Sequence, residues 1–154
     1  DLTVDFGGSY ESYNEMNEEK LPLYCVIINN LEVFSENFSK VAELIIPLYR
    51  DGAKYGVNFL ITSNSGNVLR AKTREYFVNH LCMQMGNVDD YGTYLNNCPR
   101  RFTPESFKGR GLIEMNNTVL EYQSALIAPK TELLNTIKNT INILNKEISI
   151  FKYK

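Results

Sequence analysis

Apolar residues along this chain gather in short continuous runs that are separated by polar, glycine-rich or asparagine-rich stretches. Residues 23–28 are apolar throughout, and residues 57–61 form a second, mostly apolar run with Asn58 as its polar member. A run that is apolar on both faces predicts a strand of a parallel sheet that is covered by helices on either side. Between these runs, Ser35 or Asn37 is placed to cap a helix whose last turn is ended or kinked by Pro47.

The second half of the chain predicts further alternation of helices and strands. We expect a helix at 69–78, a short strand at 81–85, a short helix at 89–95 and a hairpin with strands at 112–115 and 119–125. The hairpin turns at Asn116 and Asn117, which suits this position because asparagine tolerates a positive φ. We expect this hairpin to lie at a sheet edge.

The C-terminal segment carries the clearest helical pattern. After Pro129, apolar residues recur at spacings of three and four up to Ile148, which predicts an amphipathic helix. The favoured interpretation is that this helix packs on its own domain. Docking to a neighbouring domain or to a partner is the alternative.

Composition narrows the class of protein. The chain has 154 residues, of which 44% are hydrophobic, enough for one compact domain or a large part of one. Its net charge of −2 gives no general electrostatic reason to bind nucleic acid, which is not an expected partner. The three cysteines show no CxxC spacing and indicate a reducing cytosol, and the start at Asp1, without Met, predicts a piece of a larger protein.

Two amides follow the first strand. Because the carboxyl ends of parallel strands meet at one edge, Asn29 and Asn30 should face the loop of residues 62–66 that follows the second strand. An ATP hydrolase of the P-loop class carries acids after such a strand, one to hold Mg²⁺ and one to orient water. The amides therefore predict a switched-off Walker B strand with no catalytic residue, and no G-x-x-x-x-G-K-[ST] phosphate loop occurs in the chain.

Other enzymatic arrangements find little support. His80 adjoins an apolar strand without a nucleophilic cysteine at a recognisable spacing, so a structural imidazole is favoured. No clustered His and Cys ligands occur, and the adjacent Asp89 and Asp90 fit the start of a helix better than a metal site. We therefore expect neither a metal site nor a cofactor held by this chain alone.

The order of short motifs resembles a known family, the FtsK/SpoIIIE-type ATPase domains, in particular those of the EssC/EccC coupling proteins of type VII secretion. The matching segments are Leu21-Pro22 before the strand that ends at Asn29-Asn30, residues 56–61 followed by Asn64, residues 81–85, Asp89-Asp90, Gly109-Arg110-Gly111 and residues 122–125. The resemblance implies an α/β fold: the second half of a RecA-like P-loop NTPase core, with a mostly parallel sheet flanked by helices and a C-terminal β-hairpin and helix. It places the phosphate loop upstream of these residues.

Departures from the family pattern lie at the site that the resemblance implies. The acid pair is Asn29-Asn30, and the sensor Gln that reads the γ-phosphate is Asn64, a shorter amide. Of two basic residues expected before the second strand, Arg50 is kept and Ala53 stands at the other position. If nucleotide binding is retained, the resemblance assigns it to these amides with Arg50 and Arg110, the last of them reaching toward a neighbouring subunit.

The resemblance also implies a function. It predicts a degenerate, C-terminal third ATPase domain on the cytoplasmic side of a bacterial membrane-anchored coupling protein, which recognises WXG100-type secretion substrates rather than hydrolysing ATP. Expected partners are these substrates, the preceding ATPase domains and further copies in a homo-oligomer. ATP and Mg²⁺ remain possible ligands of the complete domain. An active ATP-driven DNA or protein translocase is the alternative, and a scaffold for assembly is a third interpretation.

These expectations divide the chain into three parts. Residues 1–20 are expected to form a polar linker or loop, residues 21–128 the degenerate core, and residues 129–154 the amphipathic helix.

Overall fold

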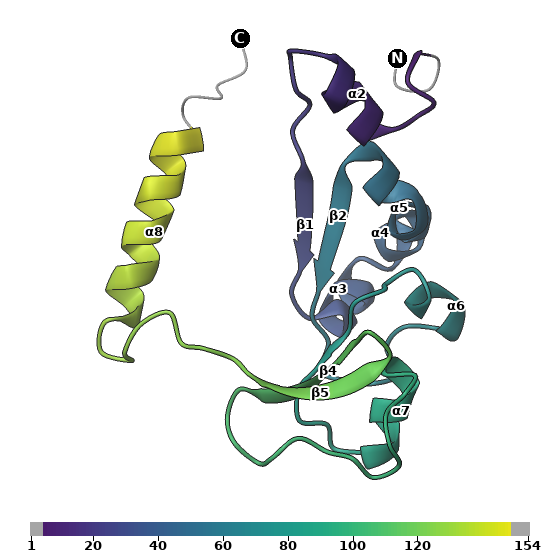
Figure 1. Cartoon of the computed structure of the whole chain (residues 1–154), viewed down its shortest axis with the longest axis vertical. Coiled ribbons are helices and arrows are strands. Elements are labelled where there is room, and N and C mark those ends of the chain that lie inside the picture. Colours follow the sequence, from purple (N-terminus) through teal and green to yellow (C-terminus); the bar gives the residue numbers. More distant parts are fainter. Residues whose placement is uncertain (1–4, 149–154) are drawn as a thin grey trace.

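The computed structural model describes residues 5–148, in which helices and strands alternate along most of the chain (Figure 1). In chain order the elements are α2 (Tyr10–Met16), β1 (Tyr24–Ile28), α3 (Leu31–Asn37), α4 (Ser39–Leu44), α5 (Ile46–Asp51), the 3₁₀-helix η1 (Gly52–Tyr55), β2 (Val57–Ile61), α6 (Ala71–Arg74), β3 (Leu81–Cys82), the 3₁₀-helix η2 (Val88–Asp90), α7 (Tyr91–Tyr94), β4 (Arg110–Met115), β5 (Thr118–Gln123) and α8 (Leu133–Ile148).

The two apolar runs form a parallel pair of strands, as predicted. β1 and β2 are in register from the pair Tyr24 and Val57 to the pair Ile28 and Ile61. One face of the pair packs on α3 and α5, where Ile28, Leu31 and Tyr49 form a buried cluster. The Tyr49 ring meets the Phe59 ring edge to face at a centroid distance of 4.8 Å, which fixes α5 against β2.

The opposite face of the parallel pair is open, and the expectation that helices cover both faces is wrong for the described residues. Ile27 and Leu60 are paired across the strands on this face, with 64% and 52% of their surface exposed. Within residues 5–148, no strand pairs with the outer edge of β1. The apolar sequence of β1 is therefore suited to a more completely covered sheet than these residues build.

The segment between the strands forms three short helices where the sequence predicted one. Phe38 interrupts the first with φ −131° and ψ 47°, which lies outside the helical region. Pro47 stands in the first turn of α5, so it begins a helix rather than ending one. The expected cap at Ser35 or Asn37 is also wrong, because the N-cap is Asn30.

The remaining strands form a separate antiparallel sheet. β3 pairs with β4, and β4 pairs with β5 in the predicted hairpin, whose turn residues Asn116 and Asn117 have φ values of 50° and 60°. The expected mostly parallel sheet is thus confined to β1 and β2 in the described residues. The antiparallel arrangement places Cys82 and Leu112 against Tyr91 and Leu95 in a second buried cluster.

The N-terminal segment is more ordered than the expected loop. Ser9 caps α2 by accepting a hydrogen bond from the backbone N–H of Ser12 over 3.2 Å. Tyr10 donates its hydroxyl to the Leu21 carbonyl oxygen over 3.1 Å, and its ring lies over Gly56. Gly56 has φ +76° and no room for a Cβ, so glycine is needed there for two reasons.

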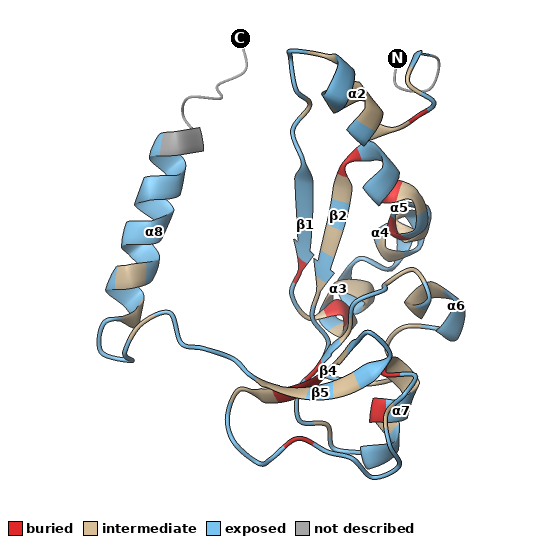
Figure 2. Ribbon diagram, in the orientation of Figure 1, coloured by how far each residue is buried: buried red, intermediate tan, exposed pale blue. Residues whose placement is uncertain are grey.

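The predicted C-terminal helix forms as α8, but it stands apart from the rest of the chain (Figure 1). Leu134, Ile141 and Leu144 have 72%, 49% and 49% of their surface exposed, and Figure 2 shows the helix almost wholly in the exposed class. The expected packing on its own domain is therefore not seen. Among the described residues, no helix combines the length and apolarity that crossing a bilayer requires.

Candidate functional site

The carboxyl ends of β1 and β2 lie side by side and their loops are joined by hydrogen bonds. The backbone N–H of Thr62 donates to the Ile28 carbonyl oxygen over 3.0 Å. The backbone N–H of Leu31 donates in turn to the Thr62 carbonyl oxygen over 2.9 Å. These bonds extend the strand pairing by one step and place Asn29 and Asn30 beside the start of the loop that contains Asn64.

Asn29 is held by the side chain of Thr62. The Thr62 hydroxyl donates to Asn29 Oδ1 over 2.7 Å and accepts the backbone N–H of Asn30 over 2.9 Å. Because a hydroxyl has one hydrogen and two lone pairs, both contacts are satisfied together. An amide in this role carries no charge with which to hold Mg²⁺, and its oxygen already accepts a bond inside the protein.

The Asn30 side chain binds a backbone N–H group of α3. It is in the left-handed region with φ 66°, which asparagine tolerates better than most residues, and its Oδ1 accepts the backbone N–H of Val33 over 3.2 Å. The side chain is therefore turned toward the first turn of α3. In this position it caps a helix, and it does not face the loop after β2.

Glu32 is a site residue that the sequence analysis missed. Its Oε1 lies 2.8 Å from Ser63 Oγ, 3.0 Å from the backbone nitrogen of Asn64 and 2.8 Å from that of Ser65. Its Oε2 is buried without a hydrogen-bond partner among the described residues. An acidic residue in the first turn of a helix is common, so the presence of Glu32 there could have been noticed. Its contacts could not, because they lie more than 30 residues further along the chain.

Hydrogen bonding keeps the Glu32 carboxylate ionised. Burial raises the pKa of this carboxyl, but bonds from its own backbone N–H, from the Ser63 hydroxyl and from the N–H groups of Ser65 and Asn64 outweigh it, so the pKa lies below its ordinary value. The crevice that was expected to meet a phosphate thus already contains a negative charge from the chain itself. Within the described residues, the side-chain amide of Asn64 makes no hydrogen bond, and only its backbone is engaged.

Arg50 is not part of this crevice. It lies in the last turn of α5, two residues before Gly52, where an added Cβ would come within 2.8 Å of the Val57 carbonyl oxygen at the start of β2. Asn64 follows the other end of that strand. The guanidinium is paired with Asp51 at 2.7 Å in an exposed position, and this pairing raises the pKa of Arg50. The structure thus separates Arg50 from the three asparagines, and the adjacent Ala53 and Lys54 lie in η1.

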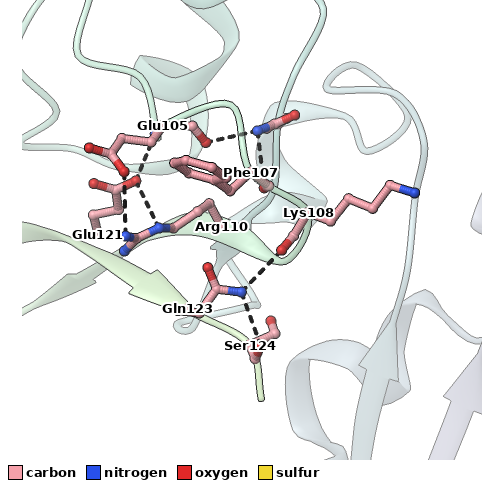
Figure 3. A network of polar contacts seen from close by, with 8 residues as sticks. Glu105, Phe107, Lys108, Arg110, Glu121, Gln123 and Ser124 are labelled. Carbon is pink, nitrogen blue, oxygen red and sulfur yellow. Dashed lines mark hydrogen bonds and ion pairs between the residues drawn. The ribbon is translucent and has the colours of Figure 1, made fainter. Parts of the chain in front are cut away.

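Arg110 is also separate, at the start of β4 in the antiparallel sheet. Figure 3 shows its guanidinium directed at two carboxylates, Glu105 at 3.4 Å and Glu121 at 3.8 Å. Glu121 also accepts the backbone N–H of Glu105 over 2.7 Å, so the three residues form one network. Two acids beside one arginine leave no uncompensated positive charge for a neighbouring phosphate in this arrangement.

The remaining sequence candidates have structural roles. Asp89 donates its backbone N–H to Asn87 Oδ1 at the start of η2, and residues 5–148 contain no group of acidic, His or Cys side chains suited to a metal ion. The His80 ring meets the Tyr94 ring edge to face at a centroid distance of 5.3 Å. Its pKa is lowered, mainly by burial and then by the charge of Arg74.

An apolar groove opens beside the crevice. It has a volume of about 420 Å³ and lies between the helix-covered face of β1 and the helices α3 to α5. Val26, Phe34, Val41 and Leu48 are among its lining residues, and Asn29 stands at its polar end. The groove thus runs from the carboxyl end of β1 along a surface that is lined mostly by apolar side chains.

Curated relatives of this chain come from secretion systems, while no family model matches it. It is 27% identical over 144 residues to the ESX secretion system protein EccC of Geobacillus thermodenitrificans, covering 87% of this chain and 9% of that protein. It is 26% identical over 106 residues to the ESX secretion system protein YukB of Bacillus subtilis, covering 66% of this chain and 7% of that protein. The chain therefore spans less than a tenth of the length of these relatives.

Solved structures show the same fold. EssC (ATPases 2 and 3) from Geobacillus thermodenitrificans matches with a TM-score of 0.78 at 23% identity, over 96% of this chain and 28% of that chain. A structure of the cytoplasmic domain of EssC matches with a TM-score of 0.69 at 24% identity, over 95% and 28%. Together, the curated relatives and the structural neighbours support the identification of this chain as an EssC/EccC-type domain of type VII secretion.

Proposed function

We propose that this chain is the second half of a degenerate RecA-like, FtsK/SpoIIIE-type ATPase domain that recognises secretion substrates in the cytoplasm instead of hydrolysing ATP. The observation that carries the proposal is the use of the Walker B positions. Asn29 accepts from Thr62 and Asn30 caps α3, so both side chains support the fold at the place where a hydrolase needs free carboxylates.

The shape of the parallel pair supports an incomplete RecA-like core. β1 has an unpaired outer edge in residues 5–148, and Ile27 and Leu60 expose apolar surface beside it. A long apolar edge strand is a liability for a soluble protein unless another element covers it. We assign this edge and open face to the remainder of the core, which would carry the phosphate loop and with it any binding of ATP and Mg²⁺.

The groove is the proposed recognition surface for substrate. Amphipathic helices bind partners by laying an apolar face into a groove, and a WXG100-type substrate would offer such a helix. The groove is almost wholly apolar, with Val41 of α4 half exposed at 45% and Phe34 of α3 beside it. Other ATPase domains of the same protein, and further copies in an oligomer, are the remaining proposed partners.

A photo-crosslinking experiment tests the recognition surface. A photoreactive phenylalanine analogue is placed at Val41 in the natural full-length protein and, as a matched control, at Leu44, which lies on the same helix and is 75% exposed outside the groove. With a purified WXG100-type substrate, we expect crosslinks from position 41 and few from position 44. Equal yields from both positions, or none from position 41, would remove the groove from the proposal.

Photoreactive ATP tests nucleotide binding at this crevice, and a parallel assay of ATP turnover tests the lost hydrolysis. Peptides of this chain labelled by the analogue report nucleotide at this crevice, even in a protein with other ATPase domains. We expect substitutions of Asn29 or Thr62 to leave the Mg²⁺-dependent ATP turnover of the protein unchanged. A selective loss of ATP turnover in Thr62→Val, with an unchanged fold, would instead favour a working ATPase site.

A further inference from the structure

The loop after β2 presents several hydrogen-bond donors to one point. Glu32 Oε1 lies within 3.0 Å of the Ser63 hydroxyl and of the backbone nitrogens of Asn64 and Ser65. The Ser63 hydroxyl also lies 2.7 Å from the Ser65 carbonyl oxygen, so its one hydrogen is shared between the two acceptors. Successive backbone N–H groups that converge in this way form a concave site for an anion.

The chain fills this site with its own carboxylate. Leu31, the residue before Glu32, is 4% exposed and belongs to the buried cluster under the sheet, which anchors the first turn of α3. Glu32 therefore reaches the loop from a fixed base. Charge-assisted bonds of this kind are stronger than bonds between neutral groups, so the contact should hold the loop.

The second oxygen of the carboxylate, Oε2, destabilises this contact. Glu32 Oε2 is buried and has no hydrogen-bond partner among the described residues. A buried acceptor without a partner carries a desolvation cost, which offsets part of the gain at Oε1. The contact is therefore weaker than three donors on one oxygen would suggest, and a competing anion needs less binding free energy to displace the carboxylate.

We propose that Glu32 is an internal ligand that closes an oxyanion site formed by Ser63, Asn64 and Ser65, and that a phosphate group must displace it to bind there. Only the source of the phosphate rests on the proposed function, since a nucleotide in the adjacent crevice would supply it to the site that this autoinhibitory contact closes. The site itself follows from the donors and the carboxylate alone.

Hydrogen–deuterium exchange of peptides covering residues 61–68 tests the proposal in the natural full-length protein. Glu32→Ala should free the N–H of Asn64, whose exchange should become at least about tenfold faster, as expected for losing a bond to a charged acceptor. The Ser65 N–H keeps its bond to Ser63 Oγ and should change less. Glu32→Gln keeps the shape without the charge and should give an intermediate rate. Glu36→Ala, on the exposed side of the same helix, is the control and should change nothing in these peptides.

A second experiment measures whether added inorganic phosphate slows the hydrogen exchange of these peptides. At millimolar concentration it should restore protection in Glu32→Ala and have little effect on the wild-type protein, while chloride at the same ionic strength should do neither. Protection by ATP at lower concentration than by phosphate would identify a nucleotide as the source, and equal potency would identify free phosphate.

Three results would overturn the proposal. These are unchanged exchange in both Glu32 variants, protection by chloride equal to that by phosphate, and equal effects of phosphate on wild type and Glu32→Ala. Because exchange in this loop is measured without substrate or hydrolysis, failure of the proposed recognition function would leave these outcomes unaffected.

Discussion

Tyr94 of α7 donates its hydroxyl to the carbonyl oxygen of Gly66 over 2.6 Å, and this bond joins the antiparallel unit to the loop after β2. The guanidinium of Arg74 also lies over the Tyr94 ring, 5.2 Å from its centroid, and His80 meets the same ring edge to face. The two sheets have separate cores, so this cluster is one of the links between them. It ties the candidate crevice to the hairpin half of the chain.

Replacing Tyr94 with Phe should destabilise the protein by about 1 kcal/mol, because the Gly66 carbonyl loses its partner while the ring packing is kept. Equilibrium unfolding in urea measures the change. Tyr13→Phe is the matched control, since the Tyr13 hydroxyl has no hydrogen-bond partner in residues 5–148 and its ring contact with Phe6 is kept. Equal losses in the two variants would mean that the bond to Gly66 contributes nothing.

The two acidic replacements of Asn30 should have unequal costs in stability. Asn30→Glu removes the cap on Val33 and puts a poor left-handed residue at φ 66°, so we expect a loss of about 1 to 2 kcal/mol. Asn30→Asp keeps both the cap and the tolerated backbone and should be close to neutral. Thermal unfolding of the two variants distinguishes them, and equal stability would show that the cap is unimportant.

Stability should fall on mild acidification through His80, the single histidine in the sequence. Its folded pKa lies below the ordinary 6.5, because burial and then the charge of Arg74 disfavour the imidazolium. The unfolded chain therefore binds the proton first, and stability that is present above pH 6.5 is lost as the pH falls through the folded pKa. Urea unfolding between pH 7.5 and about 5 should show a smaller loss in His80→Gln than in the wild type; equal slopes would contradict the assignment.

Leu112→Ala should cost about 2 to 5 kcal/mol, because the side chain is completely buried between Cys82, Tyr91 and Leu95. The control is Leu120→Ala on the neighbouring strand β5, where 45% of the residue is exposed and the loss should be much smaller. Denaturant midpoints of the two variants decide the point. Similar losses would mean that the second cluster is not a core.

For the exposed apolar side chains of α8, in contrast to Leu112, we predict almost no loss of stability on substitution. Ile141→Asp should change the unfolding free energy of the rest of the domain by less than about 0.5 kcal/mol, because the side chain is 49% exposed and α8 stands apart. A loss comparable to that of Leu112→Ala would show that the helix packs on its own domain in solution, as the sequence pattern indicated.

The strands and the hairpin could be predicted because their signals are local. The apolar runs at residues 57–61 and the Asn116-Asn117 turn each determine an element within a few positions. The cap at Asn30 could not, since Ser35 is an equally good local signal, and the left-handed backbone of Asn30 depends on its contact with Thr62. At the carboxyl edge, Asn29 contacts Thr62 of the loop after β2, whereas the Asn30 side chain caps α3 instead of facing that loop.

The part of the site that escaped prediction depends on distant contacts. Glu32 is bound by Ser63 through the folding of β2 beside β1, which no spacing along the chain reveals. The family resemblance implied a nucleotide contact for Arg50 and one toward a neighbouring subunit for Arg110, and the structure places them on separate elements, α5 and β4. Each has an acidic neighbour, Asp51 for Arg50 and Glu105 for Arg110, that a family pattern does not take into account.

The segment of residues 124–132 joins β5 to α8, and it sets how far that helix can travel. Fully extended, such a stretch reaches about 30 Å. Any surface within this radius meets the apolar stripe of α8 as a tethered ligand at an effective concentration on the order of millimolar. A contact with a dissociation constant well below a millimolar would therefore be occupied most of the time, and α8 could leave it again without unfolding the domain that carries it.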